Sequence, residues 1–158
     1  MDNKLFEDVV TALKDRGLTV GFAESLTGGL ISSSICSVPG ASSVFKGSIV
    51  SYTNSVKIGV LGVDRAVIDS ETEVSGECAV MMAQGARRLL GVDLAISVTG
   101  IAGPTGELPG KPVGTVYMGI DLKGDSSSVR FNFDGDRQAV RDKTCEKCFQ
   151  TILNLLGA

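Results

Sequence analysis

The sequence predicts an α/β fold in which a mixed β-sheet lies between two layers of helices. Helical and strand-like patterns alternate along the early part of the chain, as they do in βα units. Two strand-like runs joined by a tight turn follow, and such a pair is typical of an antiparallel hairpin. A chain of 158 residues fits one domain with a core of ordinary size, so we expect residues 1–158 to form a single three-layer α/β/α domain.

The chain opens with the pattern of an amphipathic helix. Apolar residues recur at helical spacing after a possible cap at Asn3, and Gly17 follows as a stop signal. These apolar residues are Leu5, Phe6, Val9, Val10 and Leu13. The β-prone run from Leu18 to Phe22 then predicts the first strand.

A turn rich in hydroxyls and glycine, residues 23–29, joins this strand to a helical run at 30–35. The first N–H groups of a helix are unpaired and lie at the positive end of its dipole. This turn can therefore hold an anion or a developing oxyanion beside Ser25 and Thr27. In the alternative interpretation, Ser25 or Thr27 only caps the helix while two glycines, Gly28 and Gly29, pack closely.

A second strand and a lysine come next. The alternating run from Phe45 to Tyr52 predicts the strand, and residues 53–55 supply a turn and a cap for a short helix that carries Lys57. Tyr52 and Lys57 should therefore lie near one strand end. Residues 59–72 are mixed and turn-rich, and no element is predicted there.

The middle of the chain predicts a helix and a buried strand. An apolar stripe indicates a helix over residues 76–90, and this stripe consists of Val80, Ala83, Ala86, Leu89 and Leu90. The short apolar run 94–98 is typical of a strand buried on both faces. A second glycine-rich loop, residues 99–106, leaves this strand, and such a loop is a usual place for a ligand.

The last third predicts a hairpin and a final helix. The hairpin has strands at 116–122 and 128–133, and the helix runs from about Arg137 to Leu156. Arg137 and Arg141 lie in the first turns of this helix, where a cation opposes the helix dipole.

These two arginines have two possible roles. They either pair with a carboxylate such as Asp134 or Asp136, or they serve an anionic ligand. The local sequence alone favours the ion pair.

Composition excludes several classes of protein. With 15 Lys and Arg against 18 Asp and Glu, the chain has no broad basic face, which disfavours nucleic-acid binding. The longest apolar runs are too short to span a bilayer, and the first residues lack the basic-then-apolar order of a signal peptide. We therefore expect a soluble cytoplasmic protein with no membrane partner.

The absence of histidine removes the commonest general base and the commonest zinc ligand together. Four cysteines are too few for a disulfide scaffold, and the one close pair, Cys145 and Cys148, falls inside a helical pattern. We expect no metal and no cofactor. A hydroxyl nucleophile would have to give its proton to a Lys, a carboxylate or a Tyr, and a Ser–Lys pair is a known solution for acyl transfer.

Four motifs resemble those of the CinA C-terminal domain family: AESLTGG at 23–29, SYTNSVK at 51–57, SVTGIAGP at 97–104 and KPVGTV at 111–116. The resemblance continues through residues 133–137 and covers nearly the whole chain in the family's order. Members include nicotinamide mononucleotide amidohydrolases, which hydrolyse the carboxamide to give nicotinate mononucleotide and ammonia. The resemblance does not extend to the larger N-terminal domain of full-length CinA proteins. It therefore implies a stand-alone deamidase of pyridine-nucleotide salvage.

The resemblance also implies roles for single residues. It makes Ser25 the nucleophile, Lys57 the base that takes its proton, and Tyr52 a hydroxyl that orients or relays protons between them. Lys57 must then be neutral when Ser25 attacks. An ordinary lysine titrates near ~10.4, so burial or a nearby cation must lower its pKa. The N–H groups of Thr27 and Gly28 are candidates for the oxyanion hole.

Substrate binding is predicted around the second glycine-rich loop. Its N–H groups and hydroxyls, together with the guanidinium of Arg137, are expected to bind the phosphate of the nucleotide. Glu24 either holds the lysine or pairs with a structural partner. The predicted substrate-binding set is Glu24, Thr27, Gly28, Gly29, Asn54, Ser97, Thr99, Gly100, Gly103, Thr105 and Arg137.

Two alternatives and one assembly state complete the expectations. The alternatives are a catalytically silent nucleotide-binding regulatory module and an amidohydrolase that acts on another phosphorylated amide, because a family fixes chemistry better than specificity. A homo-oligomer is expected, since glycine-rich domains of this size commonly form symmetric assemblies.

Overall fold

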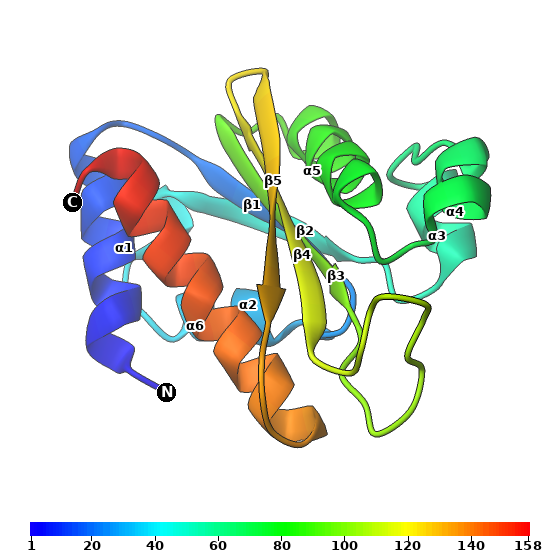
Figure 1. The fold of residues 1–158 in the computed structure, drawn as a ribbon. Coiled ribbons are helices and arrows are strands. Elements are labelled where there is room, and N and C mark those ends of the chain that lie inside the picture. The colour runs from blue at the N-terminus through cyan, green and yellow to red at the C-terminus, as the bar shows by residue number, and fades with distance from the viewer.

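A five-stranded mixed sheet with helices on both faces forms the protein in the computed structural model, which describes all 158 residues (Figure 1). The predicted α/β/α fold class is confirmed. The strands are β1 (Val20–Glu24), β2 (Phe45–Val50), β3 (Leu94–Gly100), β4 (Thr115–Leu122) and β5 (Asp125–Asn132). The helices are α1 (Asn3–Asp15), α2 (Leu30–Cys36), α3 (Asn54–Gly59), α4 (Arg65–Glu71), α5 (Gly76–Leu90) and α6 (Arg137–Leu156), with a 3₁₀ turn, η1 (Ala41–Ser43).

The strand order is β2-β1-β3-β4-β5. β1 pairs in parallel with both β2 and β3, whereas β4 is antiparallel to β3 and β5 is antiparallel to β4. The carboxyl ends of the three parallel strands therefore meet at one edge of the sheet. In open α/β sheets ligands bind at this edge, so the topology alone indicates where to look for a site.

Helices α1, α2 and α6 cover one face of the sheet (Figure 1). Their apolar stripes join the β1, β3 and β4 side chains in one cluster of 23 buried residues. Three phenylalanines lie at its centre: the Phe149 ring is 4.6 Å from Phe6 and 6.3 Å from Phe22, measured between ring centroids. The apolar spacing that predicts α1 is confirmed, since four of its five apolar residues are buried here.

Helix α5 crosses the other face, and the segment from α3 to α4 packs outside it (Figure 1). α5 approaches the sheet closely at Gly119, where an added Cβ would lie 2.1 Å from the Ala79 carbonyl oxygen. The predicted stripe on α5 is wrong at Leu89, which is 52% exposed. Leu89 lies one turn beyond Gly85, where α5 contacts Leu61, so the chain before α4 no longer covers it.

Helix α4 is the element that the sequence does not predict. Asp64 caps it by accepting a hydrogen bond from the Ala66 N–H at 2.9 Å. None of its seven residues is buried, so it lacks the apolar period that reveals the other helices.

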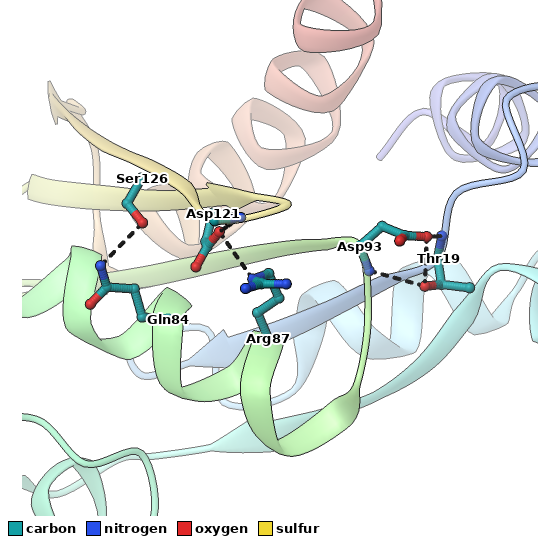
Figure 2. A network of polar contacts seen from close by, with 7 residues as sticks. Thr19, Gln84, Arg87, Asp93, Asp121 and Ser126 are labelled. Atoms are coloured by element: carbon teal, nitrogen blue, oxygen red, sulfur yellow. Dashed lines mark hydrogen bonds and ion pairs between the residues drawn. The ribbon is translucent and has the colours of Figure 1, made fainter.

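Polar contacts tie α5 to the hairpin, and a second set ties the amino ends of β1 and β3 to each other (Figure 2). The Nε of Arg87 lies 3.1 Å from the Asp121 carboxylate as an ion pair, although its N–H is not aligned for a hydrogen bond. Asp93 accepts hydrogen bonds from both the N–H and the hydroxyl of Thr19. Because these contacts gather at the amino ends of the parallel strands, they brace the fold away from the predicted site.

No helix has both the length and the apolar character needed to cross a membrane.

Candidate active site

A pocket of about 380 Å³ opens where the parallel strands end. Its volume lies within the range typical of small-molecule sites. The turn after β1, the turn after β2, the loop before α5, the loop after β3 and the start of α6 all contribute to its wall. Nine of the predicted site residues line it: Ser25, Tyr52, Asn54, Lys57, Thr99, Gly100, Gly103, Thr105 and Arg137.

Ser25 and Lys57 form the centre of this pocket. The Lys57 Nζ lies 2.9 Å from the Ser25 Oγ and 2.8 Å from the Ser51 carbonyl oxygen. Ser25 directly follows β1, and Lys57 projects from the short helix α3 that follows β2. As an ammonium group, Lys57 donates to both oxygens; as a neutral amine, it can donate to Ser51 and accept the Ser25 hydroxyl proton.

Lys57 is buried, with only 1% of its surface exposed, and no carboxylate pairs with it. Burial lowers the pKa of Lys57 from its ordinary value of 10.5, because the ammonium form loses its hydration. Cys78 and Glu73 lie near enough to oppose this effect and raise the same pKa in part. The net shift is toward the neutral amine, the form that a general base requires.

The carboxylate of Glu24 accepts hydrogen bonds from the turn after β1 and from the start of α2. Glu24 is fully buried, and three donors reach its Oε1: the Thr27 hydroxyl and the N–H groups of Gly29 and Ile31. The N–H and hydroxyl of Ser32 reach its Oε2. The expectation that the start of α2 holds a ligand anion is therefore wrong, because this carboxylate already occupies the helix N-terminus.

Glu24, Thr27, Gly28 and Gly29 consequently lie behind the pocket wall and do not line it. Glu24 pairs with a structural partner and does not hold the lysine. The Gly28 N–H donates to the Ser25 carbonyl oxygen at 3.0 Å, so it is not available to an oxyanion.

The N–H groups of Leu26 and Thr27 have no acceptor within the protein. Leu26 lines the pocket, which the sequence did not predict. The guanidinium of Arg141 binds the carbonyl oxygens of Leu26 and Thr27, each at 3.0 Å. Because the N–H and C=O of one peptide point in opposite directions, this contact turns the Thr27 N–H away from Arg141. Arg141 therefore fixes the orientation of the turn.

Arg137 lies at the start of α6 on the pocket wall. Its guanidinium donates to the Gly103 carbonyl oxygen and to the Tyr52 hydroxyl, both at 2.8 Å. No carboxylate lies within ion-pair distance of it, so the expected pairing with Asp134 or Asp136 is wrong. Asp136 instead caps α6 through the Ala139 N–H. The Tyr52 hydroxyl contacts Arg137 and forms no hydrogen bond with Ser25 or Lys57.

The remaining predicted residues divide between the pocket and the core. The Thr99 hydroxyl lines the pocket but donates to the Glu73 carbonyl oxygen at 2.8 Å, whereas Asn54 and Thr105 have free polar groups. Ser97 is fully buried, and its hydroxyl links the Ala79 carbonyl oxygen to the Gly119 N–H. Ser97 thus holds α5 on the sheet and does not face the pocket.

Glu73 lines the pocket from the loop before α5, and no sequence pattern predicted it as a site residue. It follows Thr72, a residue with a left-handed backbone (φ 69°). Nothing in the turn-rich run 59–72 identified this loop as part of a site, because its placement depends on the packing of α4 and α5.

The cysteines do not contribute a metal site. All four are free thiols, and no group of three His, Cys, Asp or Glu side chains gathers as a metal ion would require. Cys145 and Cys148 are buried within α6. Burial raises the pKa of Cys78, the thiol near Lys57, to about 11.

Comparison with known proteins places the chain in a family. Residues 2–156 match the CinA C-terminal domain. The chain is 46% identical to a CinA-like protein of Dictyoglomus thermophilum over 140 residues, which are 89% of this chain and 34% of that protein. A putative competence-damage inducible protein of Halothermothrix orenii is 42% identical over 156 residues, or 98% of this chain and 38% of that protein. The chain thus spans little more than a third of these relatives.

Solved structures agree with this assignment. The CinA superfamily protein of Klebsiella pneumoniae has a TM-score of 0.95 and 30% identity, covering 98% of this chain and 97% of that one. The competence/damage inducible protein CihA of Agrobacterium tumefaciens has a TM-score of 0.92 and 33% identity, covering 99% of this chain and 95% of that one. The chain therefore belongs to the CinA C-terminal domain family.

Proposed function

We propose that this protein hydrolyses the carboxamide of nicotinamide mononucleotide, with Ser25 as the nucleophile and Lys57 as its general base. The observation that carries the proposal is the buried Lys57 amine 2.9 Å from the Ser25 Oγ. A serine beside a neutral base can attack an amide without histidine. The chain contains none.

The reaction proceeds in two halves. Lys57 takes the Ser25 proton while Oγ bonds to the carboxamide carbon, and the same proton then passes to the leaving nitrogen, which departs as ammonia. The product of this half is an ester of Ser25. A water molecule then loses a proton to Lys57 and attacks the ester, and Lys57 returns that proton to Ser25 as the acid is released.

The turn after β1 supplies the donors for the negative oxygen of the tetrahedral intermediate. The two unpaired N–H groups of this turn belong to Leu26, which lines the pocket next to Ser25, and to Thr27, the residue behind it. Donors that are already oriented stabilise charge that develops in the transition state without having to reorganise. The Arg141 contacts with this turn supply that orientation.

Arg137 anchors the phosphate. Two of its N–H groups bind Gly103 and Tyr52, and its remaining donors are free for an anion. Tyr52 thereby positions the guanidinium and does not relay a proton between Ser25 and Lys57. Energy from this remote contact holds the carboxamide against Ser25.

The test is ammonia release from nicotinamide mononucleotide, nicotinamide riboside and free nicotinamide. We expect turnover with the mononucleotide, much weaker turnover with the riboside, and a loss of at least about 10³-fold in the Ser25→Ala variant with binding retained. Binding of the mononucleotide without ammonia release would support the silent regulatory module instead. Full activity in Ser25→Ala would rule out the serine mechanism.

A further inference from the structure

The pocket contains a carboxylate that the proposed reaction does not use. Glu73 is half-buried in the loop before α5 and lines the same cavity as Ser25 and Lys57. Its carboxylate makes no ion pair, and no hydrogen bond reaches it. Glutamates on a surface are commonly unpartnered, but this one lies beside a buried reactive pair.

The backbone around Glu73 is held by side chains from two other segments and by Ser75 of the same loop. Lys111 donates to the Glu71 and Val74 carbonyl oxygens, and Thr99 donates to the carbonyl oxygen of Glu73 itself. Ser75 donates to the carbonyl oxygen of Thr72, whose left-handed backbone turns the chain immediately before Glu73. A strained backbone conformation persists only where the surroundings determine it. The loop is thus fixed while its glutamate stays free.

The pocket consequently carries opposite charges on different walls. Arg137 contributes a cation from the start of α6, and Glu73 contributes an anion from the loop before α5. Glu73 raises the pKa of Lys57, so its charge acts at the place where the amide reacts. Nicotinamide mononucleotide has the matching pattern, because its pyridinium ring is positive and its phosphate is negative.

We infer that Glu73 recognises the positive ring of the substrate and makes the pocket selective for a pyridinium amide over a neutral one. This inference rests on the proposed function. The carboxamide is bonded directly to the ring, so a carbonyl carbon held at Ser25 brings the ring charge into the part of the pocket that Glu73 faces. Attraction between opposite charges is strong in a partly desolvated site.

The test compares the mononucleotide with its 1,4-dihydro form, which keeps the carboxamide, ribose and phosphate but has a neutral ring. Dissociation constants are measured in the Ser25→Ala background, so that neither ligand is consumed and the proton on Lys57 does not affect a rate. Glu73→Gln keeps the size of the side chain and removes its charge. Glu77→Gln is the matched control, because Glu77 is an exposed glutamate of the next turn and does not line the pocket.

We expect Glu73→Gln to weaken binding of the mononucleotide by about tenfold or more while changing the dihydro form by less than about threefold. Glu77→Gln should change neither. Equal losses for both ligands, or no loss for either, would overturn the inference. If the parent protein discriminates between the ligands through Glu73 but releases no ammonia, the proposed reaction fails and the inference stands. If the parent is active and Glu73→Gln leaves the discrimination intact, the inference fails alone.

Discussion

Two glutamates lie near Ser25 and act in opposite ways. Glu24 is buried behind the pocket and satisfied by five donors from the start of α2, whereas Glu73 faces the pocket with no donor at all. Each glutamate precedes a helix. The difference arises because α2 has no side-chain cap of its own, while α5 is already capped by Ser75, which accepts from the Cys78 N–H.

Whether a glutamate before a helix remains free for a ligand depends on whether the helix already has a cap. An uncapped helix start takes up the nearest carboxylate, so the N-terminus of α2 itself is occupied by Glu24 and is not available to a ligand anion. A helix start that is already capped leaves its glutamate available for a ligand. Under the proposed function, Glu73 and Arg137 meet the charges of the substrate from different segments of the pocket wall.

The largest expected effect concerns Ser25 and Lys57, the proposed nucleophile and its base. Ser25→Ala and Lys57→Ala should each lower kcat by at least about 10³-fold, and the double variant should be little worse, because residues that act as a unit show non-additive losses. Steady-state kinetics of ammonia release measures all three. Losses that multiply in the double variant would argue against a shared proton transfer.

The next effect contrasts the two glutamates directly. Glu24→Ala should lower the free energy of unfolding by about 3 kcal/mol or more, because it leaves several buried donors without an acceptor. Glu73→Gln should change it by less than about 0.5 kcal/mol, as for a surface residue. Urea denaturation of both variants checks this difference. Similar stability losses would mean that Glu73 also has a structural role.

A smaller effect separates the two arginines of α6. Arg137→Ala should lower kcat/KM for the mononucleotide by about 10- to 100-fold and narrow its advantage over the riboside, since of the two arginines only Arg137 lines the pocket. Arg141→Ala should lower kcat/KM for both substrates by the same factor, because Arg141 contacts only the turn after β1 and Gln138. An unchanged preference in Arg137→Ala would contradict the phosphate anchor.

The smallest effect is the pH dependence of stability due to Lys57. Its pKa is lowered in the folded protein, so above that pKa the unfolded chain binds a proton that the folded protein has released. Stability from this group therefore rises with pH, up to the ordinary lysine value, by at most about 1.4 kcal/mol per pH unit.

The Lys57→Met variant isolates this contribution. Its free energy of unfolding should rise less steeply with pH, in the range below the ordinary lysine pKa of 10.5, than that of the parent protein. Cys78 stays protonated in the folded state there, because burial raises its pKa to about 11. The free energies are measured by chemical denaturation over a series of pH values. If they changed with pH identically in both proteins, the pKa of Lys57 would not be lowered in the folded state.

Local patterns in the sequence determined most of the fold and the chemical type of the site. Apolar spacing and stop signals predicted α1, α5 and α6, because periodicity and capping depend on neighbours along the chain. The hairpin turn predicted β4 and β5 in the same way. The absence of histidine directed the search to a hydroxyl and a lysine, and the motifs supplied Ser25 and Lys57.

Only the tertiary structure decided how the polar groups are used. Burial of Lys57 depends on contacts with residues distant in the sequence, such as Ser25, and no local pattern encodes them. Three other features likewise depend on which donors and acceptors meet in space. Glu24 accepts hydrogen bonds from the start of α2, Arg137 binds the Gly103 carbonyl oxygen and no aspartate, and Glu73 lines the pocket. Charge and hydrogen-bonding capacity are written in the sequence, but their partners are set by residues far apart along the chain.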